Sequence, residues 1–161
     1  MNKYPAFWSD LNVALSHDWL TGMRGGERVL EILCRGFPKA PILTLIHNAD
    51  AVSDTINEHP VTTSWLQQVP SIFDYYRYFL PFFPHAADRL EAPKADLLIS
   101  TSHCVAKGVK VQPGTKHLCY CFTPMRYVWA FYEEYFGQNP VKKLMMEPLL
   151  KRLKAWDQEN S

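Results

Sequence analysis

The chain has 161 residues, of which 47% are hydrophobic and 20% are charged. A domain of ~150 residues buries roughly 70% of the surface that its unfolded chain exposes, so residues 1–161 are long enough for one ordinary core, and we expect a single domain. The 17 Lys and Arg residues against 16 Asp and Glu leave a net charge of +1, which excludes a global field that would attract nucleic acid or an acidic membrane.

The cysteine content and the start of the chain indicate a cytoplasmic protein. Residues Met1–Pro5 are polar and interrupted by proline, unlike a secretory signal peptide. We therefore expect the four cysteines to be reduced; they are Cys34, Cys104, Cys119 and Cys121. No segment approaches the roughly 18 apolar residues of a membrane span, so any membrane contact would be peripheral, at the inner face.

The first third of the chain predicts a strand, a glycine loop, a helix and a second strand. The apolar run Asn12–Ser16 leads into the loop, and apolar residues at helical spacing follow over Glu27–Phe37 until Pro38. Ile42–Ile46 repeats the strand pattern. Parallel pairing of the two strands would make a right-handed β-α-β unit.

The middle third, residues 48–93, is less regular. It contains a short strand candidate at Val61–Thr63 and helical segments interrupted by Pro70, Pro81 and Pro84. Its aromatic stretch, Tyr75–Phe83, fits three roles: a core segment, an acceptor-binding surface or an interfacial belt at a membrane.

The last third predicts two buried strands, each followed by polar residues. The strands are Asp96–Ser100 and Lys116–Cys121, which are short, apolar and bounded by turn residues. A helix over 126–136 would follow an N-cap at Thr123, with Pro124 in the first helical position.

A final helix begins near Pro140, and we expect it to kink or break at Pro148. Together the elements predict an α/β fold, a Rossmann-like open and mainly parallel sheet with helices on both faces. Ligands of such sheets bind outside the carboxyl ends of the strands. Three predicted strands end in polar patches, at 17–27, 101–108 and 123–127, so we expect the functional site there.

The glycine loop is a candidate phosphate site. Gly25 and Gly26 stand at the start of the predicted helix, where backbone N–H groups and the helix dipole favour an anion. Their spacing from Gly22 fits neither the dinucleotide fingerprint nor the P-loop, so a purely structural turn is an equal alternative.

His103 is the candidate titratable group of the second patch. It lies between Ser102 and Cys104 and near Lys107, and this density of donors favours a site over a structural histidine. A hydrolase with Ser102 or Cys104 as the nucleophile is disfavoured, because the sequence identifies no base for it.

A zinc site is a further alternative. His117, Cys119 and Cys121 alternate, so they would share one face of a strand, with Cys104 or His103 as a fourth ligand. Their spacing matches structural zinc sites poorly, and we expect no metal.

Three segments together resemble the amino-terminal half of family 4 glycosyltransferases, in the bacterial mannosyltransferase-like branch. They are Asn12–Leu30, Ser100–Val109 and Cys119–Tyr127, in this order and at matching spacing. Such enzymes have the GT-B arrangement, two Rossmann-like domains that face each other across a cleft. The resemblance implies transfer of a hexose such as mannose from a GDP- or UDP-linked nucleotide sugar to a glycan or lipid-linked acceptor, with retention at the anomeric carbon and without a further cofactor.

The resemblance also implies roles for individual residues. Gly25 and Gly26 would bind the donor diphosphate, and His103, the catalytic candidate, would approach the transferred sugar. The acceptor side would be lined by Asp18, Trp19, Lys107, Thr123, Arg126 and Tyr127.

Two departures from the family pattern reduce the expected activity. Phe122 stands where relatives carry histidine, and the sequence ends at Ser161 without the donor domain and its pair of glutamates. We therefore expect residues 1–161 to be a truncated acceptor-side domain that is inactive alone. The alternatives are a non-catalytic sugar- or protein-binding module, which would self-associate through an unfinished sheet edge, and a zinc or thiol protein.

Overall fold

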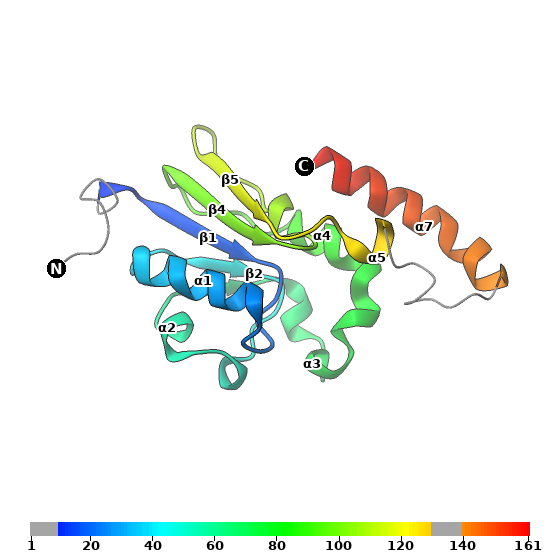
Figure 1. Cartoon of the computed structure of the whole chain (residues 1–161), viewed down its shortest axis with the longest axis horizontal. Coiled ribbons are helices and arrows are strands. Elements are labelled where there is room, and N and C mark those ends of the chain that lie inside the picture. Colours follow the sequence, from blue (N-terminus) through cyan, green and yellow to red (C-terminus); the bar gives the residue numbers. More distant parts are fainter. Residues whose placement is uncertain (1–9, 130–139) are drawn as a thin grey trace.

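A computed structural model describes residues 10–129 and 140–161 as an α/β fold around a five-stranded parallel sheet (Figure 1). The strands are β1 (Val13–His17), β2 (Ile42–Thr44), β3 (Val61–Thr63), β4 (Leu97–Ser102) and β5 (Lys116–Cys121). Their order across the sheet is β3-β2-β1-β4-β5. Since β4 lies on the other side of β1 from β2, the direction of winding reverses between β1 and β4. The predicted Rossmann-like fold is confirmed.

Helices lie on both faces of this sheet, as predicted. Along β1, Val13 and Leu15 pack with Leu30 on one face, whereas Ala14 packs into a second cluster on the other face. The first face is covered by α1 (Gly25–Gly36) and α2 (Asp54–Asn57), and the second by α3 (Ile72–Tyr75), η4 (Tyr76–Phe82), α4 (Phe83–Ala87) and α7 (Pro140–Glu159). The remaining short helices are η2 (Ala49–Ala51), η3 (Trp65–Gln68), η5 (Ala106–Gly108) and α5 (Arg126–Trp129).

The prediction that Lys116–Cys121 is a buried strand is wrong about burial. All residues of β5 are exposed, with Leu118 and Tyr120 each 58% exposed. The strand stands at the edge of the sheet and pairs with β4 on one side only. The composition of β5 correctly predicted a strand. Burial depends on whether another element covers the strand, and among the described residues no element buries the faces of β5.

The helix after β5 starts at Arg126 as predicted, but its predicted N-cap is wrong. Helix α5 begins at Arg126, and the N–H of Trp129 donates to the carbonyl of Met125 at 3.1 Å, so Thr123 is not the N-cap. The side chain of Met125 is only 1% exposed and anchors the start of the helix in the core. The rest of the predicted helix, residues 130–136, lies outside the described residues.

The last helix, α7, starts at Pro140 as predicted but is not broken at Pro148. A helix-interior proline removes one backbone hydrogen bond. Four side chains just after Pro148 pack against the core and offset this loss; they are Leu149, Leu150, Leu153 and Trp156. Within the described ranges, no helix is both long and apolar enough to cross a bilayer.

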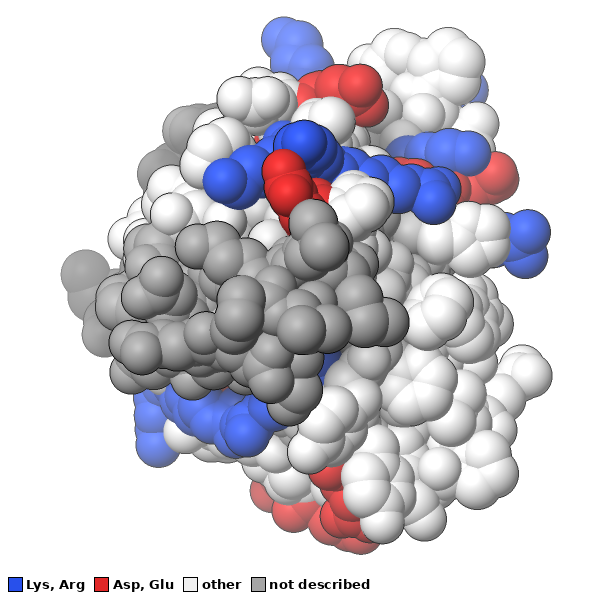
Figure 2. Space-filling view, turned by 90° about the vertical axis from the view of Figure 1, so that its right-hand side faces the viewer, with Lys and Arg blue, Asp and Glu red and all other residues white. Residues whose placement is uncertain are grey.

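A buried ion pair and a close ring contact fix α7 to η5, the short helix that follows β4. Lys107 Nζ lies 2.7 Å from Asp157 Oδ1, and both side chains are 5% exposed. The ring of Trp156 packs so closely on Gly108 that a Cβ at position 108 would overlap it. On the face that Figure 2 shows, Lys and Arg side chains lie among Asp and Glu side chains, and on α7 Lys151 Nζ lies 2.9 Å from Glu147 Oε1.

Candidate functional site

Asp18 forms the centre of the candidate site, at the carboxyl ends of β1 and β4. It follows β1 directly, and it is fully buried. Its carboxylate accepts hydrogen bonds from the successive backbone N–H groups of residues 103–106, at 2.7 to 3.1 Å, and from Ser102 Oγ at 3.1 Å. The carboxylate therefore holds the loop that follows β4 against the end of β1.

The same carboxylate orients His103. The ring nitrogen Nδ1 lies 2.8 Å from Asp18 Oδ2. Because an ionised carboxylate only accepts hydrogen bonds, Nδ1 carries a proton, and Nε2 is an acceptor whenever the ring is neutral. The ring packs edge-on against Trp19, with ring centroids 4.6 Å apart, and its side chain is 24% exposed. An imidazole fixed in this way can accept a proton or a hydrogen bond at Nε2.

The surroundings of Asp18 have opposite effects on its pKa. Burial alone would raise the pKa, but the hydrogen bonds and charge interaction with His103, together with the nearby His17, lower it from 3.8 to about 2. Asp18 is therefore ionised at neutral pH and keeps its role as an acceptor.

His17 connects this centre to the glycine loop. It is the last residue of β1, it is buried, and its Nδ1 lies 2.7 Å from Thr101 Oγ1. Burial lowers the pKa of His17 and outweighs the neighbouring carboxylates of Asp18 and Glu27, which would raise it. The buried imidazole of His17 is therefore neutral, and it lies against the start of α1 at Gly26.

The two glycines at the start of α1 have different surroundings. A Cβ added at Gly26 would lie 3.2 Å from Cε1 of His17, whereas a Cβ added at Gly25 would meet nothing within 4 Å. Gly26 therefore has a packing reason to be glycine. Gly25 has none of this kind, and its side of the helix start is open to a ligand.

The remaining predicted residues are not all brought to one place. Trp19 is 5% exposed and packs against both His103 and the ring of Tyr76, whose centroid is 5.5 Å away. The ammonium of Lys107 is engaged by Asp157 and therefore anchors α7 instead of facing the Asp18–His103 pair.

The third polar patch is described only in part. Thr123 Oγ1 is buried and has no hydrogen-bond partner among the described residues. For Arg126 and Tyr127 the structure describes the backbone, which belongs to α5. Their predicted acceptor roles remain predictions.

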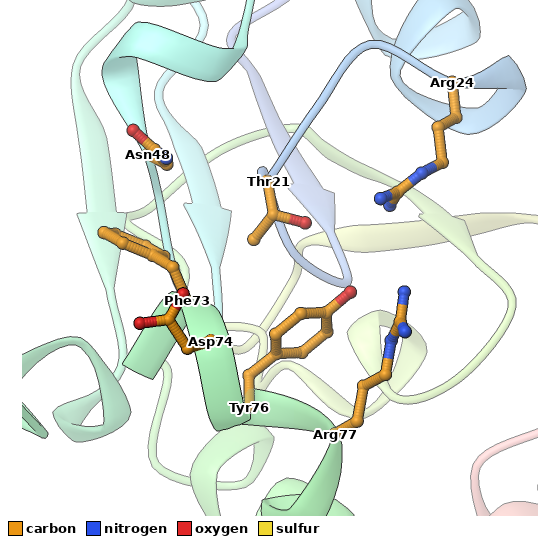
Figure 3. A pocket seen from close by; sticks show the side chains of 7 residues that line it. All are labelled: Thr21, Arg24, Asn48, Phe73, Asp74, Tyr76 and Arg77. Atoms are coloured by element: carbon orange, nitrogen blue, oxygen red, sulfur yellow. The ribbon is translucent and has the colours of Figure 1, made fainter. Parts of the chain in front are cut away.

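A cavity of about 410 Å³ is lined in part by Tyr76, whose ring packs on Trp19 with ring centroids 5.5 Å apart (Figure 3). Its lining comes from the glycine loop, the segment after β2 and the aromatic stretch; the residues are Thr21, Arg24, Asn48, Phe73, Asp74, Tyr76 and Arg77. None of the predicted site residues is in this set. The sequence singled out both the loop and the aromatic stretch, but nothing in it showed that they meet.

The described residues give no support to the zinc alternative. Across 10–129 and 140–161, no three His, Cys, Asp or Glu side chains are placed to hold a metal ion. His117 Nε2 instead lies 2.8 Å from Ser100 Oγ. All four cysteines are free thiols, of which Cys34 and Cys104 are buried.

Comparison with known proteins identifies no relative: no protein-family model, curated protein or solved structure matches the chain. The resemblance to family 4 glycosyltransferases therefore depends on the segments 12–30, 100–109 and 119–127 alone.

Proposed function

We propose that this chain is the acceptor-side domain of a retaining glycosyltransferase, which transfers a hexose from a GDP- or UDP-linked sugar to a glycan or lipid-linked acceptor. The observation that supports this most strongly is that the Asp18–His103 pair and the start of α1 lie at one edge of the sheet, where β1 and β4 end side by side. Open α/β sheets bind ligands at this reversal point. The enzyme would work in the cytoplasm, at the inner face of the membrane.

The chemistry of sugar transfer suits these groups. Positive charge develops on the sugar and negative charge on the leaving phosphate, so backbone donors aimed at the phosphate lower the barrier. The N–H groups at Gly25 and Gly26, at the positive end of the α1 dipole, are suitable donors. A second domain would bind the rest of the nucleotide.

His103 would hydrogen-bond the transferred sugar through Nε2. Asp18 would act as a positioning residue, because it holds Nδ1 and also the backbone from which the ring projects. These two contacts fix the orientation of the imidazole ring, so the direction of Nε2 is fixed without a contact to Nε2 itself.

The proposal is tested by joining residues 1–161 to the donor-binding domain of a family 4 enzyme and measuring transfer of a radiolabelled hexose, with the anomeric configuration of the product determined by NMR. We expect retention, and we expect His103→Ala to lower kcat about 100-fold, as for loss of one transition-state donor. Arg28→Gln, an exposed change on α1, is the matched control and should leave kcat unchanged. Turnover unaffected by His103→Ala, or a folded fusion that binds donor and transfers nothing, would contradict the proposal.

A further inference from the structure

One side of this cavity has the groups that bind an anion. Figure 3 shows the guanidinium groups of Arg24 and Arg77 pointing toward the same space as the hydroxyl groups of Tyr76 and Thr21. Thr21 Oγ1 is buried and has no hydrogen-bond partner among the described residues. A buried hydroxyl without a partner is costly, which indicates that a ligand atom completes this side.

The charges of the lining favour a phosphate over a neutral ligand. Two guanidinium groups and the single carboxylate of Asp74 leave the lining with a net charge of +1. Arginine pairs with phosphate through parallel N–H donors, and its planar group also stacks on aromatic rings. Arg77 Cζ lies 5.5 Å from the centroid of the Tyr76 ring, so this guanidinium is positioned at the cavity by the aromatic segment itself.

The opposite side of the cavity suits a sugar ring. Asn48, Phe73 and Asp74 lie together there (Figure 3). Amide and carboxylate oxygens accept hydrogen bonds from hydroxyl groups, and the flat apolar face of an aromatic ring can pack against the C–H face of a sugar. The cavity volume, 410 Å³, is in the range of small-molecule sites.

We propose that this cavity binds a phosphorylated hexose as the acceptor, with its phosphate at Arg24 and Arg77 and its ring against Phe73. The inference rests on the proposed function, because it assigns the acceptor class of that transferase. In the same aromatic stretch as Tyr76, the side chains of Tyr75, Tyr78 and Phe82 are 54%, 81% and 51% exposed. A hexose phosphate free in solution and one attached to a lipid would share the chemistry that the cavity recognises.

Calorimetric titration of the 161-residue chain without any donor tests the proposal separately from transfer. The probes are glucose 1-phosphate, inorganic phosphate and methyl glucoside. We expect glucose 1-phosphate to bind at least about tenfold more tightly than either of the others, because only it engages both sides of the cavity. Arg24→Gln and Arg77→Gln should each weaken it about tenfold. The control Arg28→Gln, outside the lining, should not.

Thr21→Val distinguishes ligand binding from a structural role. The change removes the unpartnered hydroxyl and keeps the side-chain shape, so we expect weaker binding of glucose 1-phosphate with no loss of unfolding temperature. A lower unfolding temperature with unchanged affinity would overturn the proposal. So would equal affinity for glucose 1-phosphate and inorganic phosphate, or binding insensitive to Arg24→Gln.

Vesicles that contain a polyprenyl phosphohexose distinguish the two sources of the ligand. Tighter binding to these vesicles than to free glucose 1-phosphate, relative to vesicles of the same lipid without the sugar, would assign the lipid-linked form. Equal binding would assign the free form, and either result supports the proposal. Binding to neither, while unfolding curves show a folded chain, would refute it.

Discussion

Asp18 determines the local structure of the site because one carboxylate satisfies several backbone donors at once. The sequence predicted that the residues after the first and fourth strands would meet, since the carboxyl ends of parallel strands share an edge. It could not predict that Asp18 would bind the backbone of residues 103–106, because these donors come from a loop more than 80 positions away. His103 was predicted as a site residue, but its orientation by Asp18 is visible only in the structure.

The pKa of Asp18 predicts a loss of stability in acid. The pKa in the folded state, about 2, is below the ordinary value of 3.8, so the unfolded state takes up the proton first as the pH falls. The contribution of ionised Asp18 to the free energy of unfolding is therefore fully present above about pH 4. This contribution, about 2 kcal/mol in total, is lost as the pH falls from about 4 to about 2. Urea unfolding across this range should show the loss, and the Asp18→Asn variant should lack this component. An equal acid dependence in both proteins would contradict the assignment.

At the scale of elements, periodicity predicted the type of each segment, helix or strand, more accurately than its bounds or its burial. The helical spacing over 27–37 corresponds to α1, which starts two residues earlier, at Gly25. The apolar composition of Lys116–Cys121 predicted β5, but exposure depends on what covers the strand, which its own residues do not encode. Pro148 predicted a kink or a break, and the structure has no break there, because core packing of the following residues holds the helix together.

The contact between α7 and η5 leads to a prediction about two glycines. In Gly108→Ala the new methyl group would overlap the ring of Trp156, which is also held by a 3.0 Å hydrogen bond from its Nε1 to Asp88. We expect a loss of roughly 1–3 kcal/mol in the free energy of unfolding, as for overpacked cores. Gly25→Ala is the matched control, since its Cβ meets nothing within 4 Å and the change should be near zero or stabilising. Equal stability of the two variants in urea would show that α7 is not fixed through this contact.

At the scale of the whole molecule, the strand order explains why one edge of the sheet collects the candidate groups. The reversal between β1 and β4 places His17 and Asp18 beside the loop that begins with His103, and α1 starts above His17. The sequence could not predict the cavity, because its lining brings Thr21 and Arg24 together with residues 73–77, some 50 residues later in the chain. No local sequence pattern encodes that contact. Tyr76, which lines the cavity, and His103 both pack against Trp19, with ring centroids 5.5 Å and 4.6 Å from it.

The most direct test of the central claim is an NMR titration of the ¹⁵N-labelled chain with GDP-mannose and with UDP-glucose. The claim is that the carboxyl edge of the sheet, at the start of α1 and at His103, binds an activated sugar. We predict that the largest shift changes fall on the amides of Gly25 and Gly26 and on the His103 ring. Changes confined to the amino ends of β1 and β4, near Asn12 and Asp96, or no changes at millimolar ligand, would contradict it.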